Sequence, residues 1–476
     1  MKPSPIQRLW RYAVSHQGAV WRASVHSVLN KIFDLAPPAL IGLAVDSVVS
    51  PTTSALHGYG YTRLSDQLWV IAGLTIVVWG LESLFEFAYK VAWRNLAQQI
   101  QHELRQDVYR QVQRLDASWF ANQKSGRLMS ILNDDINQLE RFLDAGANDV
   151  IQVGCTVITV GAIFFWVNPD VAFLAVLPIP IILWGSFIFQ RKIAPRYAEV
   201  REDASLLNAA LNNRLMGIDT IKSFTSEEIE SQHIERLSET YRQSNASAIK
   251  LSSAFSPLIR MAILVGFVGT IVHGGILAGD GVIAVGTYSM LVFLTQRLLW
   301  PLTRLGATFD LYQRAMASAD RALDLLDLKP DENLNGVPIQ TPVRGDIDFH
   351  SMCFGYPQRE ALFKDFSLSV SAGNTIALVG ATGSGKTTLT RLLLGLYRPS
   401  SGAITIDDQP LSDLDIRSVR RQIGLVSQSV YLFPGTIADN ILYGCPRASR
   451  EAMYAAAKDA ECLSFIESFP DGFETE

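Results

Sequence analysis

The chain contains 476 residues, with 41 basic and 46 acidic side chains and a formal net charge of −5. This balance excludes the strongly basic composition typical of nucleic-acid-binding proteins, so we expect no nucleic-acid partner. Hydrophobic residues make up 48% of the sequence and the mean hydropathy is +0.17, which indicates membrane-spanning segments.

The first 17 residues predict a short helix that lies along a membrane surface. Apolar side chains recur there at helical spacing, whereas Arg8 and Arg11 fall on other faces. An amphipathic segment of this kind favours the interface between water and lipid. The apolar set consists of Ile6, Leu9, Trp10, Ala13 and Val14.

Six long apolar stretches follow, and each is close to the ~20 residues that a helix needs to cross the hydrocarbon core. The purest of them, Val171 to Phe189, contains no charged residue. Together they predict an all-α membrane domain with six transmembrane helices. We place the stretches at 20–49, 68–92, 145–167, 171–190, 254–277 and 282–303.

Several of these stretches contain ionisable or polar side chains. Such groups are costly at membrane depth and usually face a bundle interior or water. Each of them either lines a substrate cavity or is paired or extended toward the membrane surface, and we favour the second interpretation. Lys31 and Asp34 are three residues apart, so they can pair on one helix. The full set is Lys31, Asp34, Glu82, Glu86, Arg260, Gln296 and Arg297.

The distribution of basic residues predicts the orientation in the membrane. The N-terminus and two long segments, 93–144 and 191–250, are rich in basic residues, whereas the connections after the first, third and fifth stretches are short or poor in them. Basic connections stay in the cytoplasm. We therefore expect a multi-pass integral protein of a bacterial inner (plasma) membrane with a cytoplasmic N-terminus.

The two basic segments also predict helices that continue out of the membrane. Residues 95–115 and 203–237 are rich in Gln, Glu, Arg, Leu and Ala and contain almost no Gly or Pro. Each segment is interrupted once, at 116–120 and at 217–220. We expect these interruptions to form turns between antiparallel helices at the cytoplasmic tip.

The sequence changes character after the membrane half. Residues 327–342 are polar and punctuated by Pro and Gly, as is typical of a linker. Residues 346–354 alternate between apolar and polar side chains, which predicts an antiparallel strand. The continuous apolar run 375–379 is suited to a buried parallel strand.

A glycine-rich motif follows this run. Residues 380–388 read GATGSGKTT and lead into the helical segment 389–394. They match G-x-x-x-x-G-K-[ST], the phosphate-binding loop, in its strand, turn and helix context. An ordinary glycine-rich turn is the alternative, and the full match with its flanks argues against it. We expect the chain to bind ATP or GTP with Mg²⁺.

The loop residues have distinct expected roles. Side chains at its glycines would block the approach of a triphosphate to the backbone N–H groups. Lys386 supplies positive charge for the β- and γ-phosphates, and Thr387 offers a hydroxyl to Mg²⁺. The expected site consists of Gly380, Ala381, Thr382, Gly383, Ser384, Gly385, Lys386, Thr387 and Thr388.

Six spans, two cytoplasmic helical hairpins and a phosphate-loop domain together resemble an ATP-binding cassette (ABC) exporter half-transporter of the multidrug or lipid-flippase type. The resemblance covers essentially the whole chain. It implies a multi-domain fold, with an all-α six-helix transmembrane domain followed by an α/β phosphate-loop nucleotide-binding domain that is incomplete. In the membrane half it is carried by 115–120 (LDASWF), 126–128 (GRL), 134–135 (DD), 217–224 (GIDTIKSF), 301–302 (PL) and 319–321 (ADR).

The resulting domain plan has four parts. They are an interfacial elbow helix (1–17), a transmembrane domain (18–322), a linker (323–343) and a partial nucleotide-binding domain (344–476). We expect the nucleotide-binding domain to lie in the cytoplasm.

The resemblance implies roles for two further residues. The segment 354–357 looks like the one whose aromatic ring, here Tyr356, stacks on adenine, which contributes about 1–3 kcal/mol. The alternative for Tyr356 is a core aromatic at a strand end. Residues 423–428 look like the strand that ends in the family's Gln loop. Gln428 would then ligate Mg²⁺ or the attacking water and act in catalysis.

Several motifs of the family do not occur before Glu476: the LSGGQ signature, the Walker B aspartate with its adjacent glutamate, and the switch histidine. Those groups hold Mg²⁺ and orient water for phosphoryl transfer. We therefore expect a C-terminally truncated chain, an ABC-type ATPase by resemblance, that binds nucleotide and hydrolyses it poorly.

The function that the resemblance implies is ATP-driven export of an apolar or amphipathic substrate by alternating access in a dimer within the lipid bilayer. Drug, lipid and peptide remain open as substrates, as do a homodimer and a heterodimer with a second half-transporter. The alternative is a truncated, hydrolysis-deficient ATP-binding membrane protein with a regulatory or vestigial role. A membrane-attached GTPase is disfavoured because no N-K-x-D-like guanine-binding motif is present.

Overall fold

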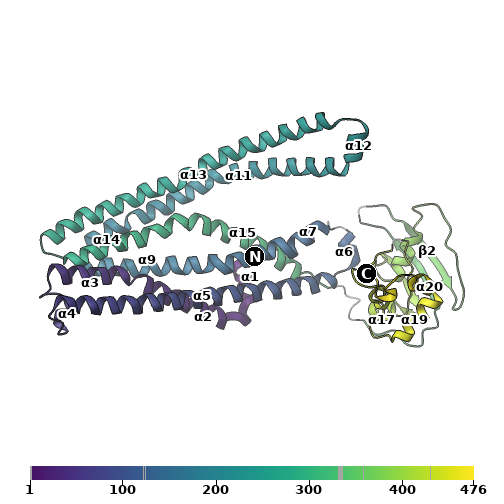
Figure 1. Ribbon diagram of the computed structural model, residues 1–476. Helices are drawn as coiled ribbons and strands as arrows, with labels where there is room; N and C mark the ends of the chain where they lie inside the picture. The colour runs from purple at the N-terminus through teal and green to yellow at the C-terminus, as the bar shows by residue number, and fades with distance from the viewer. Residues whose placement is uncertain (1–2, 122, 124, 331–335, 358, 429) are drawn as a thin grey trace. The chain divides into compact units, whose positions relative to one another are not determined.

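The computed structural model describes residues 3–121, 123, 125–330, 336–357, 359–428 and 430–476 (Figure 1). The chain separates into two compact units, Met1–Asp331 and Glu332–Glu476. The expected linker, 323–343, spans the junction of the two units, and its residues 331–335 lie outside the described part of the chain.

The N-terminal segment forms α1 (Pro5–Tyr12) followed by a 3₁₀ turn (Ala13–His16). Leu9 and Ala13 are buried, so one face of this segment packs into the helical unit. The opposite face exposes apolar side chains, as a helix at a lipid interface does. These exposed side chains are Ile6, Trp10 and Val14.

Five helical segments in the described part of the chain are long and apolar enough to cross a membrane. Continuous helices satisfy the backbone N–H and C=O groups within each segment, as hydrocarbon requires. The segments are Pro5–Val49, Leu64–Gln113, Gly126–Val167, Pro169–Met216 and Glu227–Gly279.

The sixth expected span, 282–303, departs from the expectation. Its helix α14 (Val285–Leu299) has 15 residues and gives way to a 3₁₀ turn, Trp300–Arg304. Pro301 lies in that turn, and proline lacks the N–H that would continue the helix. The described residues therefore form five long apolar segments, and the sixth expected span is replaced by the shorter helix α14.

The other helices of this unit complete the bundle. Two π-helical turns, Ile131–Asp135 and Phe142–Gly146, flank α8. The helices are α2 (Gln17–Asp34), α3 (Pro37–Val49), α4 (Ala55–Gly58), α5 (Leu64–Gln113), α6 (Ala117–Ala121), α7 (Ser125–Ser130), α8 (Ile136–Arg141), α9 (Ala147–Val167), α10 (Pro169–Val176), α11 (Pro178–Met216), α12 (Ile218–Ser223), α13 (Glu227–Gly279) and α15 (Leu305–Leu326).

The prediction that helices continue beyond the apolar stretches is confirmed. Helix α5 runs for 50 residues and α13 for 53 residues. Helices α11 and α13 lie side by side, and α12 joins them at one tip (Figure 1). The two expected interruptions are also present, since α5 ends before α6 and α11 ends at Gly217 before α12.

Two of the apolar clusters in the helical unit each join at least four of its helices. One packs α1, α5, α8 and α15 around Leu104, Ile136 and Ala319. The other joins α9, α10, α13 and α14 around Phe164 and Leu291. Full burial of a large apolar side chain stabilises a fold by about 1.5–3 kcal/mol, so each cluster fixes the packing of its helices.

A buried carboxylate connects the π-helical turn before α8 to α15. The side chain of Asp135 is 10% exposed, and its Oδ2 accepts a hydrogen bond of 2.8 Å from Arg321 Nε. Ser318 Oγ donates to Asp135 Oδ1 over 2.9 Å. The carboxylate beside Arg321 holds the pKa of that guanidinium above its ordinary value. The two sequence motifs 134–135 and 319–321 therefore meet in the fold.

We expect Arg321→Ala to destabilise the helical unit by about 3 kcal/mol, because it leaves the buried Asp135 charge without a cation. Ser318→Ala, which removes one neutral donor, should cost only about 1 kcal/mol. The thermal unfolding midpoint of the purified protein in detergent measures both. The double variant Arg321→Ala with Asp135→Asn should recover most of the loss, and a double variant as unstable as Arg321→Ala would contradict this account.

The second unit contains a four-stranded antiparallel sheet in the order β2-β1-β3-β4. In the register, Ile347 lies opposite both Val370 and Ile406. The antiparallel strand predicted at 346–354 is confirmed as β1. The elements are β1 (Ile347–Phe354), β2 (Phe363–Val370), β3 (Ser401–Ile406), β4 (Gln409–Pro410), α16 (Lys386–Leu393), α17 (Ile416–Arg420), α18 (Ile437–Leu442), α19 (Arg450–Asp459) and α20 (Leu463–Glu467).

The segments 375–379 and 423–428, expected as strands of a parallel core, form no strand. Val379 is 93% exposed and Val426 98% exposed. A parallel strand needs a neighbour to pair its backbone groups, and no described segment of the chain pairs with either run. The parallel-strand prediction is therefore wrong for this structure, and the sheet that does form is antiparallel.

The carboxylate of Asp407 binds the backbone N–H groups of the three residues that precede β1. Its side chain is 8% exposed. Oδ2 accepts from the Arg344 N–H at 2.6 Å, and Oδ1 accepts from the N–H groups of Gly345 and Asp346 at 2.9 Å each. Burial pushes the pKa of this carboxyl up, but the three N–H donors outweigh it and hold the pKa below its ordinary value.

A depressed pKa contributes stability that is present above the ordinary aspartate pKa of about 3.9 and is lost as the pH falls through the lower folded-state value. We expect hydrogen exchange of the amides at 344–346, corrected for intrinsic rates, to accelerate below about pH 4. Asp407→Asn should expose these amides already at pH 7 and remove the acid dependence. Asp408→Asn is the matched control, because that side chain is 92% exposed. Unchanged exchange in Asp407→Asn would disprove the assignment.

Candidate functional site

The phosphate-binding loop ends where α16 begins, at Lys386. Gly383 and Gly385 have φ of 87° and 99°, in the left-handed region that favours glycine. The Ser384 N–H donates to the Ala381 carbonyl at 3.1 Å, and the Leu389 N–H donates to the Gly385 carbonyl at 3.0 Å. A tight turn thus leads directly into the N-terminus of α16. The free N–H groups and the positive dipole end of a helix N-terminus favour binding of an anion.

The structure adds a packing reason for two of the glycines. A Cβ at Gly385 would come within 2.6 Å of the Phe363 ring, and one at Gly380 within 2.7 Å of Ser384 Oγ. The sequence predicted only that side chains would obstruct a triphosphate. A side chain at Gly385 is therefore disfavoured by both the left-handed backbone and the Phe363 ring, whereas one at Gly380 would require the Ser384 side chain to move.

Lys386 folds its ammonium group over the loop. Nζ donates to the carbonyl oxygens of Gly380 at 2.7 Å and Ala381 at 2.9 Å. The adjacent Thr387 is exposed on the first turn of α16. A lysine ammonium has three donors, so one donor stays available to an incoming phosphate oxygen. The Lys386 charge, the Thr387 hydroxyl and the N-terminus of α16 therefore lie together, as expected of a phosphate-binding site.

Tyr356 lies beside the same helix. Its hydroxyl is 3.1 Å from Oγ1 of Thr388, the second threonine of the motif. The half-buried ring makes edge contacts with Phe354 and Tyr397, at centroid distances of 5.1 and 5.2 Å. The sequence offered no signal for Thr388 and Tyr397 as partners. The fold therefore connects the expected adenine-stacking residue directly to the phosphate loop, while its role toward the base stays a prediction.

Gln428 lies exposed in a bend at the end of the run 423–428. Because that run forms no strand here, no sheet positions the Gln428 side chain. Its role toward Mg²⁺ or water also stays a prediction.

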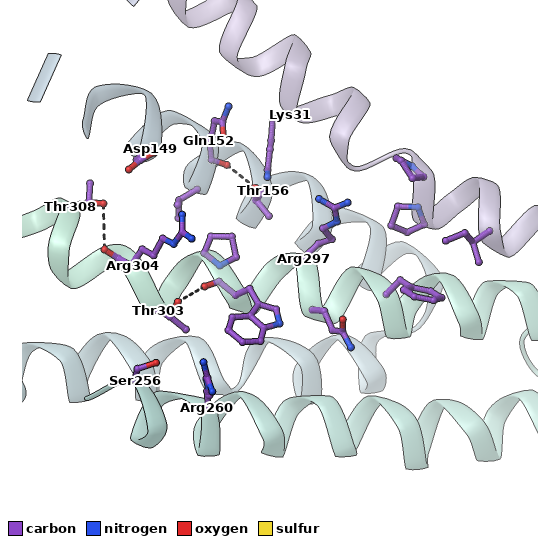
Figure 2. Close-up of a pocket in the computed structure, with 18 of the residues that line it drawn as sticks. Lys31, Asp149, Gln152, Thr156, Ser256, Arg260, Arg297, Thr303, Arg304 and Thr308 are labelled. Atoms are coloured by element: carbon purple, nitrogen blue, oxygen red, sulfur yellow. Dashed lines mark hydrogen bonds between the residues drawn. The ribbon is translucent and has the colours of Figure 1, made fainter. Parts of the chain in front are cut away.

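The helical unit contains a cavity of about 950 Å³ (Figure 2). Of the polar residues singled out from the sequence, Lys31, Arg260, Gln296 and Arg297 line it. Asp149 and Arg304 also line it and were missed. Arg304 lies just beyond the last expected span, whereas Asp149 falls inside the stretch 145–167 and could have been found.

The predicted pairing of the membrane charges is confirmed for Lys31, whereas a role in binding substrate stays a prediction for the residues that line the cavity. Lys31 Nζ lies 2.7 Å from Asp34 Oδ2, so the predicted pair forms, and Arg297 pairs with the other oxygen of the same carboxylate. Arg260 instead lies over the Trp300 ring, 5.4 Å from its centroid. That distance is within the range of cation–π attraction.

Comparisons with known proteins agree with both halves of this description. The profile of the ABC transporter transmembrane region matches residues 23–302, and the ABC transporter profile matches residues 363–473, which include the phosphate loop. An uncharacterized ABC transporter ATP-binding protein of Bacillus subtilis, YknV, is 29% identical over the whole chain and 78% of its own length. A fatty acid ABC transporter ATP-binding/permease protein of Mycobacterium bovis is 30% identical over 78% of this chain and 59% of its own length.

A solved structure shows the shared fold. The structure of a bacterial Atm1-family ABC exporter with ATP bound superposes with a TM-score of 0.79 at 22% identity, covering 97% of this chain and 80% of the other. The chain therefore belongs to the ABC transporter family and combines that family's transmembrane region with its nucleotide-binding domain.

Proposed function

We propose that this integral membrane protein uses ATP, bound at the phosphate loop, to export an apolar or amphipathic substrate. The observation that carries the proposal is a phosphate loop at the N-terminus of α16 in the same chain as a membrane unit with a large internal cavity. Membership of the ABC transporter family implies ATPase activity. Export under this proposal follows from a difference in ATP affinity between two conformations of the transporter.

The residues that would hold the nucleotide fit this role. Lys386 would turn its ammonium toward the β- and γ-phosphates, Thr387 would offer its hydroxyl to Mg²⁺, and Gln428 would contact Mg²⁺ or water. The fit is supported by the left-handed glycines and by the exposure of Thr387. When bound, ATP with Mg²⁺ supplies the free energy for transport.

The assembly belongs to the same proposal. We infer a dimer with a second half-transporter, identical or different, in a bacterial inner membrane, with the N-terminus and the nucleotide-binding unit in the cytoplasm. The asymmetry of basic connections supports this orientation.

The names of the relatives do not single out one substrate among apolar and amphipathic molecules. The fatty acid transporter of Mycobacterium bovis is 30% identical. A multidrug efflux ATP-binding/permease protein of the same species is also 30% identical, over 83% of this chain and 33% of its own length. Equal identity to both gives no preference, so the proposal names apolar and amphipathic substrates as a class.

Loss of the loop cation should abolish tight nucleotide binding. We expect Lys386→Ala to weaken Mg-ATP binding by about 10- to 100-fold, the loss of a charged hydrogen bond worth about 1.5–3 kcal/mol. Equilibrium binding of labelled ATP to the purified full chain measures this. Lys364→Ala, which removes an exposed lysine from β2, is the matched control. Unchanged affinity in Lys386→Ala would show that nucleotide binds elsewhere, and the turnover rate measured on the same samples tests the ATPase activity.

The ring of Tyr356 should contribute through stacking on the base. We expect Tyr356→Leu to weaken ATP binding by about tenfold, within the 1–3 kcal/mol typical of base stacking, while Tyr356→Phe stays close to the parent. Affinity for inorganic tripolyphosphate, which has no base, should be the same in all three proteins. If Tyr356→Leu weakens ATP and tripolyphosphate equally, the ring supports the loop only as a core aromatic.

A further inference from the structure

The charges around the large cavity fall into two groups. Lys31 and Arg297 share the carboxylate of Asp34, and Glu82 lies close enough to interact electrostatically with both cations. This first group has two positive and two negative charges, so its members neutralise one another. It therefore leaves little capacity for an additional ion.

The second group carries an excess of positive charge. Arg260 and Arg304 line the cavity from α13 and from the 3₁₀ turn after α14, and among the described residues Asp149 is the one carboxylate that lines it with them (Figure 2). Arg260 has no ion-pair partner among the residues that the structure describes, whereas Arg304 interacts electrostatically with Asp149. A cation without a carboxylate partner inside a membrane-spanning stretch is costly, and an anionic ligand would relieve that cost at Arg260.

Arg260 is held in a geometry that suits an anion. Its guanidinium lies over the Trp300 ring, 5.4 Å from the centroid. A cation–π contact is made by the charge of the guanidinium, so its N–H donors can still bind a carboxylate or phosphate with two parallel hydrogen bonds. The Trp300 ring therefore holds the cation in place without accepting the hydrogen bonds that an anion would need.

An apolar pocket of about 290 Å³ adjoins the cavity at the same residue. Arg260, Gln296 and Trp300 line both spaces. The remaining wall of the smaller pocket is mostly apolar, and much of it follows one face of α13 beyond Arg260, at helical spacing. This wall consists of Met261, Ile263, Leu264, Phe267 and Thr295.

We propose that the substrate is an amphiphile with a small anionic headgroup, bound with its head on Arg260 and Arg304 in the cavity and its hydrocarbon chain in the apolar pocket. The inference rests on the proposed export function, for which it names the substrate class. A cationic amphiphile would place like charges together, and a neutral one would leave Arg260 without a partner. The arrangement therefore selects for the sign of the head charge as well as for an apolar chain.

Binding of oleate to the full chain in phosphatidylcholine nanodiscs tests this proposal. Oleyl alcohol and oleyltrimethylammonium keep the chain and change only the head, so they serve as competitors. We expect saturable binding of radiolabelled oleate, with both competitors at least about tenfold weaker, since a charged hydrogen bond contributes about 1.5–3 kcal/mol. Equal competition by oleyltrimethylammonium would overturn the proposal.

Variants locate the binding site. Arg260→Gln should weaken oleate binding by about tenfold and leave the affinity for oleyl alcohol unchanged, while Arg260→Lys should retain part of the oleate affinity. The matched control is Arg191→Gln, because Arg191 also stacks on an aromatic ring, Phe187, at 4.7 Å, yet lines neither space. Unchanged ATP binding in each variant shows that the protein is folded. Equal oleate affinity in Arg260→Gln and the parent would disprove the site.

Two further competition experiments distinguish a bilayer lipid from a free anion as the ligand. Displacement of oleate by phosphatidylglycerol in the disc would support a bilayer lipid as the ligand. Displacement by inorganic phosphate at the same concentration would show that the chain is not recognised and would overturn the proposal. ATP-driven transport into proteoliposomes is measured separately. Arg260-dependent oleate binding without transport would contradict the export function alone, and transport of another substrate without oleate binding would contradict this inference alone.

Discussion

Backbone hydrogen bonding in hydrocarbon is the constraint on which the membrane unit depends. Each N–H and C=O group there must find its partner inside the protein, and a continuous helix provides that partner locally. The long helices α5 and α13 follow from this requirement and continue well beyond their apolar stretches. The break at Pro301 occurs where the 3₁₀ turn lines the internal cavity, a place where irregular backbone is tolerated.

The same low-polarity surroundings organise the charges. Asp34 pairs with two cations there, and outside the apolar stretches the buried Asp135 binds Arg321 and accepts a hydrogen bond from Ser318, so both carboxylates join helices that are distant in sequence. Buried ion pairs of this kind fix the register of helices more than they add net stability. Arg260 differs because it contacts an aromatic ring rather than a carboxylate, which is why we propose it as the residue that binds an anionic ligand.

The nucleotide-binding unit shows which features are local and which are not. The phosphate loop forms from neighbours in sequence: left-handed glycines, a one-turn hydrogen bond and a helix that starts at Lys386. The runs 375–379 and 423–428 have strong strand propensity, yet they stay unpaired and exposed. Strand formation needs a partner from elsewhere in the fold, whereas a turn and a helix do not.

The sequence by itself determined five of the six expected membrane segments, the helical hairpins, the antiparallel strand β1 and the position of the phosphate loop, because periodicity, composition or a contiguous motif specifies each of them. Only the tertiary structure decided which strands pair, that Tyr356 contacts Thr388, and that Asp135 meets Arg321. It also decided which membrane charges pair with one another and which of them line the cavity without a carboxylate partner. These outcomes depend on contacts between residues far apart in the chain, and a pattern along the sequence carries no information about the distance between such residues in space.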